Sequence, residues 1–120
     1  MRVALPVRQR GDSRVINMDL KPAGVTHAVD LLRALSDPTR LQIMATLSEA
    51  GEPVCVCDFT AALGLSQPTI SHHIGKLRQV GLVKVTKSGI WSFYQLAPNL
   101  APPTRALLDS AVAAATRPSR

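Results

Sequence analysis

Hydrophobic residues recur every three to four positions, the helical period, in five segments of the chain. Between the fourth and the fifth of these segments, hydrophobic residues alternate with polar ones. The five predicted helices run from Gly24 to Leu35, from Pro38 up to Gly51, from Asp58 to Leu65, between Ser66 and Gly81, and from Thr104 to Ala115. Leu82 to Thr86 and Ile90 to Leu96 are rich in β-branched and aromatic residues, and turn residues 87–89 separate them. The pattern therefore predicts a mainly α-helical fold with one small β-hairpin.

The fourth helix has both of its ends encoded in the sequence. Ser66 is a good N-cap residue, Pro68 fits the first turn, and Gly81 fits the position that ends a helix. Its apolar residues, which form one buried stripe, are Ile70, Ile74 and Leu77. The residues projected onto the opposite face are Thr69, His72, Lys76 and Gln79. This exposed face carries hydrogen-bonding groups and no carboxylate.

Two helices joined by a short turn containing Gly64, the second with a polar and basic outer face, predict a helix-turn-helix. The hairpin that follows is then a wing, and the element order is α-α-α-α-β-β-α. In a major groove, the residues expected to meet bases or nearby phosphates are Gln67, Thr69, Ser71 and His72. Those expected to position the protein on the backbone are Lys76, Lys84 and Lys87. Lysines on an edge hairpin also serve to prevent aggregation.

Charge supports this interpretation through its distribution. The 120 residues carry a formal charge of +6, and no acidic residue lies between Asp58 and Asp109. A phosphate backbone repels carboxylates, so their absence favours binding to DNA, although a solvated basic face explains the charge alone equally well. Arg40 is expected to be exposed on the first turn of its helix.

The remaining composition predicts one domain in a reducing compartment. No apolar run is long enough to span a membrane, and the basic start of the chain lacks the apolar core of a secretory signal. Two cysteines in such a chain are expected to stay free, which favours the cytoplasm. Residues 1–21 are predicted to be a flexible basic tail, 22–116 the DNA-binding and dimerisation domain, and 117–120 a C-terminal tail.

The first and last helices predict a homodimer. The stripe of Val25, Ala28, Val29 and Leu32 indicates a helix largely covered by other structure. The last helix lies outside a complete winged helix, so its stripe, which contains Leu108, needs an apolar partner. The first helix of a second copy is the simplest one. A twofold dimer presents two reading helices about 34 Å apart, which predicts a palindromic operator.

Cys55 and Cys57 form a Cys-x-Cys pair at the start of the third helix. In an ideal helix, residues i and i+2 point in nearly opposite directions, so one thiophilic ion can bridge both sulfurs only where the turn is not helical. Ligand capture would then reshape the helix start and tilt the helix-turn-helix. The helix N-terminus is expected to favour the thiolate form of these cysteines. Alternatively, the cysteines are small buried hydrophobic residues.

Three segments together resemble the ArsR/SmtB family of winged-helix, metal-sensing repressors over about residues 25–97. They are Ala34 to Arg40, Val54 to Phe59 and Leu65 to His73, and the Cys-Val-Cys-Asp element is similar to the arsenic-sensing branch. The resemblance implies a dimer without ligand that represses a detoxification operon. It also implies that arsenite or antimonite binds Cys55 and Cys57 and releases the DNA, with no obligatory cofactor.

The sequence departs from that branch at one position. Thr60 stands where the arsenic sensors have a third cysteine, and the chain contains no other cysteine.

Cadmium and lead sensors draw further cysteines from the N-terminal tail, and zinc and nickel sensors use Asp and His on the last helix, which here has Asp109 and no histidine. His72 and His73 are disfavoured as metal ligands.

Other functions remain open from sequence alone. The same repressor can respond to cadmium, lead, zinc, nickel or thiol oxidation, or to no inducer. A small thiol oxidoreductase is disfavoured because the chain has no Cys-x-x-Cys and no base beside a nucleophile, so we do not expect an enzyme. A winged helix used only for protein interaction would bind no operator even at low salt.

Overall fold

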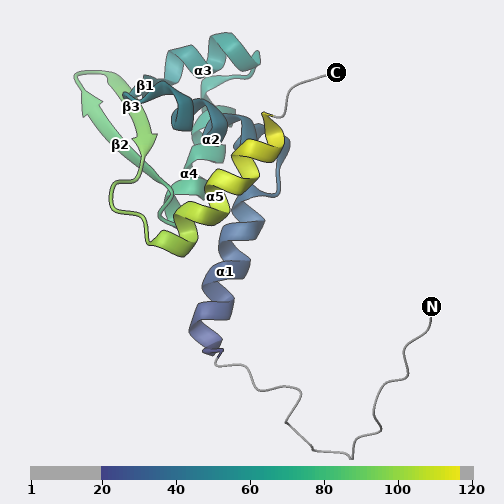
Figure 1. The fold of residues 1–120 in the computed structure, drawn as a ribbon. Coiled ribbons are helices and arrows are strands. Elements are labelled where there is room, and N and C mark those ends of the chain that lie inside the picture. Colours follow the sequence, from purple (N-terminus) through teal and green to yellow (C-terminus); the bar gives the residue numbers. More distant parts are fainter. Residues whose placement is uncertain (1–19, 117–120) are drawn as a thin grey trace, which may run out of the picture.

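The computed structural model describes residues 20–116 and confirms the mainly α-helical winged helix-turn-helix. In chain order the elements are α1 (Pro22–Leu35), α2 (Pro38–Ala50), β1 (Val54–Cys55), α3 (Val56–Leu63), α4 (Gln67–Gln79), β2 (Val83–Ser88), β3 (Trp91–Leu96) and α5 (Pro102–Ala115), as Figure 1 shows. The two predicted tails, at 1–21 and 117–120, lie almost entirely outside the described residues.

Capping residues determine where the helices begin and end. The side chain of Asp37 caps α2 by accepting a hydrogen bond from the backbone nitrogen of Arg40 at 3.0 Å. Ser66 caps α4 in the same way, accepting from the nitrogen of Thr69 at 3.3 Å. Gly64 ends α3 with φ at 66°, a left-handed conformation that glycine adopts without steric cost. These ends fix the turn between α3 and α4.

A short strand that the sequence analysis missed joins the hairpin. β2 and β3 pair antiparallel from Val83 opposite Leu96 to Ser88 opposite Trp91, and β1 pairs antiparallel with β3, with Cys55 opposite Phe93. The strand order is β1-β3-β2. The predicted helix at Asp58 therefore starts earlier, at Val56, and directly follows a strand.

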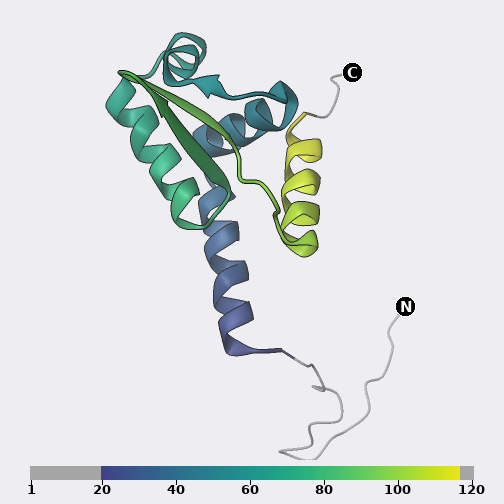
Figure 2. The same cartoon turned by 90° about the vertical axis from the view of Figure 1, so that its left-hand side faces the viewer.

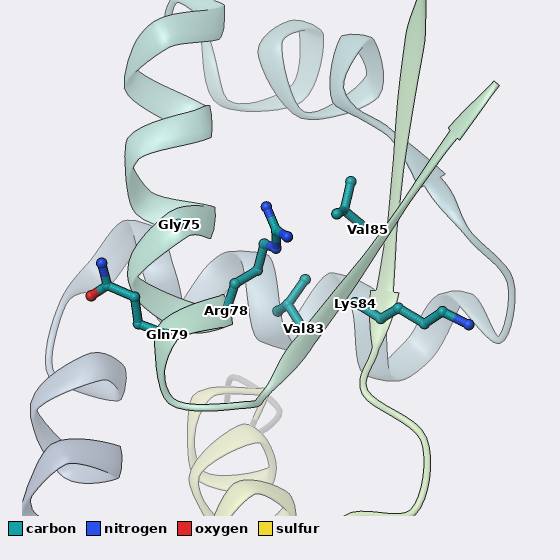
Figure 3. Close-up of a pocket in the computed structure, with 6 residues that line it drawn as sticks. All are labelled: Gly75, Arg78, Gln79, Val83, Lys84 and Val85. Carbon is teal, nitrogen blue, oxygen red and sulfur yellow. The ribbon is translucent and has the colours of Figure 1, made fainter. Parts of the chain in front are cut away.

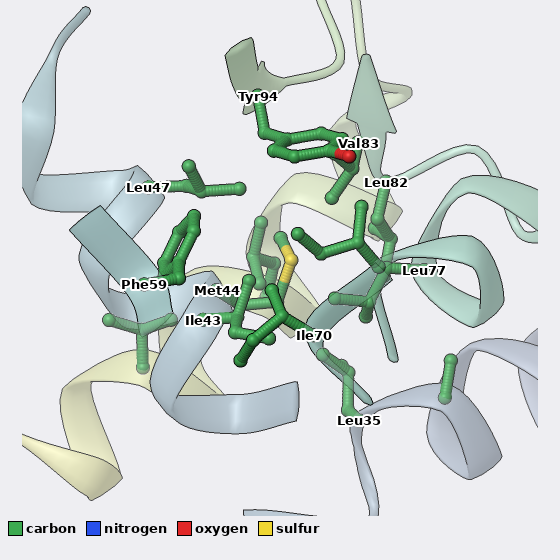
Figure 4. Close-up of a cluster of buried hydrophobic side chains, with 14 of the residues drawn as sticks. Leu35, Ile43, Met44, Leu47, Phe59, Ile70, Leu77, Leu82, Val83 and Tyr94 are labelled. Atoms are coloured by element: carbon green, nitrogen blue, oxygen red, sulfur yellow. The ribbon is translucent and has the colours of Figure 1, made fainter. Parts of the chain in front are cut away.

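The core gathers around α4, whose predicted stripe of Ile70, Ile74 and Leu77 is confirmed as buried. Figure 4 shows side chains of α2 and of the hairpin closing over this stripe. The other fully buried large side chains are Ile43, Met44, Leu82 and Leu108. A recognition helix held by so many apolar contacts is a rigid platform for its polar face.

The expectations for α1 and α5 need correction. α5 packs on α2 and buries Leu108 and Val112, so its stripe finds a partner within the same chain. By contrast, α1 is not largely covered: it projects from the body in Figures 1 and 2. Only the C-terminal part of α1 is buried, whereas Leu32 has 52% of its surface exposed. The unpartnered apolar face therefore belongs to α1. No helix among residues 20–116 is long and apolar enough to cross a membrane.

Candidate functional site

The outer face of α4 is open to solvent. All five residues predicted on this helix to meet DNA are exposed: Gln67, Thr69, Ser71, His72 and Lys76. The hydroxyl of Ser66 donates to the hydroxyl oxygen of Thr69 at 2.9 Å, so the proton of Thr69 stays available for an outside acceptor. The face opposite the buried stripe thus presents hydrogen-bond donors and acceptors to a ligand outside the protein.

Lys84 and Lys87 are exposed on β2, beside the recognition helix. Successive side chains of a strand point to opposite faces, so these two lysines, three positions apart, lie on opposite faces of the hairpin. In Figure 3 the side chain of Lys84 points away from α4. The hairpin therefore offers positive charge on both of its sides.

Arg40 holds three helices together and is only partly exposed, so the expectation of an exposed side chain was wrong. Its Nε donates to the carbonyl oxygen of Ala34 at 2.7 Å, at the C-terminal end of α1. A second guanidinium nitrogen lies 3.4 Å from the carbonyl oxygen of Arg33, and a third lies 3.4 Å from Nδ1 of His73 on α4. The cation thus donates to carbonyl groups at the negative C-terminal end of α1, in addition to the backbone hydrogen bond that the carbonyl of Arg33 accepts from Ser36. The side chain ties α1 to the recognition helix.

Asp37 completes this polar cluster. Its Oδ2 lies 3.8 Å from Nδ1 of His73. The pKa of the Asp37 carboxyl is lowered, chiefly because the backbone nitrogen of Arg40 donates to it and, in addition, because the Arg40 guanidinium is near. His73 thus anchors α4 on α2, while the ring of its neighbour His72 stays exposed with the two ring centroids 6.0 Å apart. Sequence spacing gave no signal that Arg40 and His73, which are 33 positions apart, would be in contact.

The two cysteines meet at the junction of β1 and α3. Cys55 is the last residue of β1 and the N-cap of α3, with extended backbone at φ −68° and ψ 144°. Its sulfur accepts a hydrogen bond from the backbone nitrogen of Cys57 at 3.4 Å. Because Cys55 lies outside the helix, its side chain folds over the first turn and the two thiols are neighbours. Cys55 thus stands in extended backbone just before the helix, which is the non-helical geometry that the sequence analysis required for one ion to bridge both sulfurs.

The two thiols differ in environment. Cys55 is buried with 9% of its surface exposed, whereas Cys57 is exposed. The pKa of Cys57 is raised, mainly because its side chain hydrogen bonds to that of Cys55. The expectation that the helix N-terminus favours the thiolate is therefore wrong for Cys57. Cys57 is therefore a protonated thiol at neutral pH.

No third ligand stands beside the pair within the described residues. The hydroxyl of Thr60, at the position of the missing third cysteine, donates to the carbonyl oxygen of Cys57 at 2.9 Å and is thus committed to the helix. Across residues 20–116, no three His, Cys, Asp or Glu side chains gather as a metal site would require. The residues present fit a thiophilic ligand held by two sulfurs with its remaining positions filled from solution.

The cysteine site touches the reading helix through packing. Val56 and Phe59 of α3 are buried in the shared core, and α3 lies against α4. A rearrangement at the first turn of α3 therefore changes contacts that hold the recognition helix.

Arg78 was missed by the sequence analysis. It is exposed in the last turn of α4 and lines a groove with Lys84 on β2 (Figure 3). The signal was present: Arg78 follows the buried Leu77 and precedes the turn at Gly81, so it has to lie beside the returning strand.

Residues 37–85 match the model of the family described as bacterial regulatory protein, arsR family. The arsenical resistance operon repressor of Escherichia coli is 43% identical over 83 residues, which cover 69% of this chain and 70% of the relative. The structure of HlyU from Vibrio cholerae is similar with a TM-score of 0.64 and 30% identity, covering 75% of this chain and 92% of that one. A homodimeric winged helix-turn-helix DNA-binding domain from Mycobacterium bovis gives a TM-score of 0.66 at 25% identity, covering 82% and 87%.

Proposed function

The chain belongs to the arsR family of bacterial regulatory proteins, and from that premise we propose that it is a homodimeric repressor released from its operator by arsenite or antimonite. Family membership makes it a transcriptional repressor and not an enzyme. The observation that carries the rest is the meeting of Cys55 and Cys57 at the start of the helix packed against the DNA-reading helix.

On DNA, α4 enters the major groove of a palindromic half-site. Gln67, Thr69, Ser71 and His72 meet bases or adjacent phosphates, and Lys76 binds the backbone. Lys84 and Lys87, on opposite faces of the hairpin, straddle the backbone or enter the minor groove. The exposure of all seven side chains and the acid-free sequence around them support this assignment.

The dimer forms through α1. Leu20, Val25, Val29 and Leu32 are exposed on or beside this helix, and an apolar face of this kind is costly to leave in water. A second copy of the chain covers it and sets the two reading helices one turn of DNA apart. The similar domain from Mycobacterium bovis is described as homodimeric. We place the repressor in the cytoplasm, where operator DNA and reduced thiols occur together.

Arsenite binds by exchange at both sulfurs. Each thiol gives its proton to a hydroxyl of arsenous acid, water leaves, and an As–S bond forms, so two bonds release two waters without any change of oxidation state. The third position on arsenic keeps a hydroxyl or takes a thiol from solution, because Thr60 is committed to the carbonyl of Cys57. Several named relatives of the chain are arsenical resistance repressors.

Release follows from geometry at the β1–α3 junction. Two As–S bonds fix the separation of the sulfurs of Cys55 and Cys57 and replace the hydrogen bond that now joins Cys55 to the first turn of α3. The start of α3 shifts, and α4 shifts with it because the two helices pack together. The ligand thereby favours a form of the dimer whose reading helices no longer fit two half-sites.

A fluorescence-anisotropy titration on the palindrome upstream of the chain's own gene tests the proposal. Binding that exceeds binding to a scrambled duplex, and release by arsenite or antimonite, are the expected results. Adding cadmium, lead, zinc and nickel in turn, and then a mild oxidant, separates the alternatives. Release by one of these agents but not by arsenite would keep the repressor and replace its inducer. The absence of binding even at low salt would leave only a protein-interaction module.

A further inference from the structure

A groove of about 640 Å³ runs between the recognition helix and the first strand of the hairpin. In Figure 3 it separates α4 from β2, which the turn at Gly81 joins at one end. The residues that line it are Gly75, Arg78, Gln79, Val83, Lys84 and Val85. We call it the α4–β2 groove.

One charge dominates this groove. The guanidinium of Arg78 stands between α4 and β2, next to the methyl groups of Val83 and Val85 (Figure 3). Arg78 is exposed, and no carboxylate pairs with it within residues 20–116. Its aliphatic stem has an apolar surface to lie on, while its fork of donors faces open space. An unpaired guanidinium held in this manner suits a phosphate.

The surroundings keep the groove open and positive. Gly75 faces it from the middle of α4, and no atom lies within 4 Å of where its Cβ would stand. Alternation along β2 puts Lys87 on the same face as Val83 and Val85. The nearest acidic residues in sequence are Asp58 and Asp109, far outside the groove-forming segment.

The geometry of duplex DNA identifies the ligand. When a helix lies in the major groove and a hairpin reaches the neighbouring minor groove, one sugar-phosphate strand separates the two. We infer that this strand passes along the α4–β2 groove and that Arg78 holds one of its phosphates. The inference rests on the proposed DNA binding and adds a contact that fixes how deep α4 enters. Because a phosphate is the same in every sequence, the contact contributes to affinity and register and not to base preference.

Arg78→Met tests the contact, because methionine keeps an apolar stem over the valines and removes the charge. The slope of log affinity against log salt should fall by about one, on operator and on scrambled duplex alike, and operator affinity should fall about tenfold. Arg78→Lys should restore the slope but only part of the affinity, since it loses the fork. Arg105→Met, which removes the same charge from α5, should leave the slope at the wild-type value.

A single-phosphate experiment excludes a purely structural role. Methylphosphonate, which is uncharged, is placed in turn at each phosphate between the half-site and its flanking minor groove. At one position the substitution should weaken DNA binding by the wild-type protein about tenfold and leave DNA binding by the Arg78→Met variant unchanged. This non-additivity is expected when Arg78 contacts that phosphate directly. If wild-type protein binds the operator but every substitution acts equally on both proteins, the groove assignment is wrong while the repressor stands. If wild-type protein binds no DNA, the proposed function itself fails.

Discussion

The sulfur of Cys55 lies 3.4 Å from the backbone nitrogen of Cys57, which joins the end of a strand to the first turn of a helix. The relationship places near one another two cysteines that a continuous helix would point in nearly opposite directions. Because Cys55 is the N-cap residue of α3, its sulfur also caps the first turn of that helix through this hydrogen bond. A ligand that takes the sulfur of Cys55 removes that cap.

The thiol of Cys57 should react slowly at neutral pH although it is exposed. Its raised pKa keeps it protonated, so alkylation by iodoacetamide should rise about tenfold per pH unit from pH 7 up to its raised pKa. In Cys55→Ala the hydrogen bond is lost, the pKa of Cys57 falls, and alkylation at pH 8 should be faster. Mass spectrometry of the peptide that contains Cys57 gives the rate. Identical profiles for the two proteins would show that Cys55 does not control this thiol.

The cap of α2 should be worth a measurable part of the stability. Asp37→Ala should lower the free energy of unfolding by about 1 kcal/mol, the usual cost of losing such a cap. The pKa of Asp37 is lower in the folded state than in the unfolded state. Its contribution to the free energy of unfolding is therefore fully present at pH values above the ordinary pKa of the carboxyl, and it is lost as the pH falls through the lowered pKa of the folded state. Urea denaturation of wild type and variant should therefore converge under strongly acidic conditions. Asp109→Ala, which breaks only an exposed ion pair with Arg105, should cost less than about 0.5 kcal/mol at pH 7.

Arg40 should matter for DNA binding although it is not expected to contact DNA. Arg40→Met removes the donors to Ala34 and His73 and should lower the free energy of unfolding by about 2 kcal/mol. Well below the unfolding temperature, its operator affinity should still fall, because α4 is less firmly held against α1 and α2. Circular dichroism and anisotropy at one temperature separate the two effects. Arg33→Met, in an exposed neighbour that contributes only its backbone carbonyl, should change neither quantity.

Placing a charge on the apolar face of α1 should dissociate the dimer. Burial of a leucine is worth about 1.5–3 kcal/mol, and the proposed interface would contain two copies of Leu32, so Leu32→Asp should raise the dimer dissociation constant at least about 100-fold. Sedimentation velocity at micromolar concentration measures this. Ile90→Asp is the matched control, since Ile90 is 90% exposed at the hairpin turn, away from α1. A wild-type protein that is monomeric at this concentration would overturn the dimer.

The reading helix was predictable because its signals are local. Ser66, Gly81 and the stripe containing Ile74 determine a start, an end and a buried face within 16 residues, and the structure has all three. The start of α2 is equally local, because Asp37 caps it and Pro38 occupies its first turn. The inner face of α2 is less clear from sequence, because its apolar residues lie all around the helix; Ile43 and Met44, adjacent in the chain, are both fully buried.

The features that the sequence did not reveal depend on tertiary contacts. β1 is two residues long and exists because Val54 and Cys55 find partners on β3, 40 and 38 residues further along the chain. Its presence moves Cys55 out of the helix and brings the thiols together. The contact of Arg40 with His73 and the coverage of α5 by α2 likewise arise from packing between distant segments.

The most direct test of the sensing mechanism is arsenite titration of operator-bound wild-type protein and of the Cys55→Ser/Cys57→Ser double variant, followed by fluorescence anisotropy. Both proteins should bind the operator equally well without arsenite, since neither sulfur is assigned to the DNA. Arsenite should weaken wild-type binding about 10- to 100-fold, the usual range of coupling between two sites, and should leave the double variant bound. Release of the double variant by the same arsenite concentration would contradict the account, because the signal would then enter elsewhere.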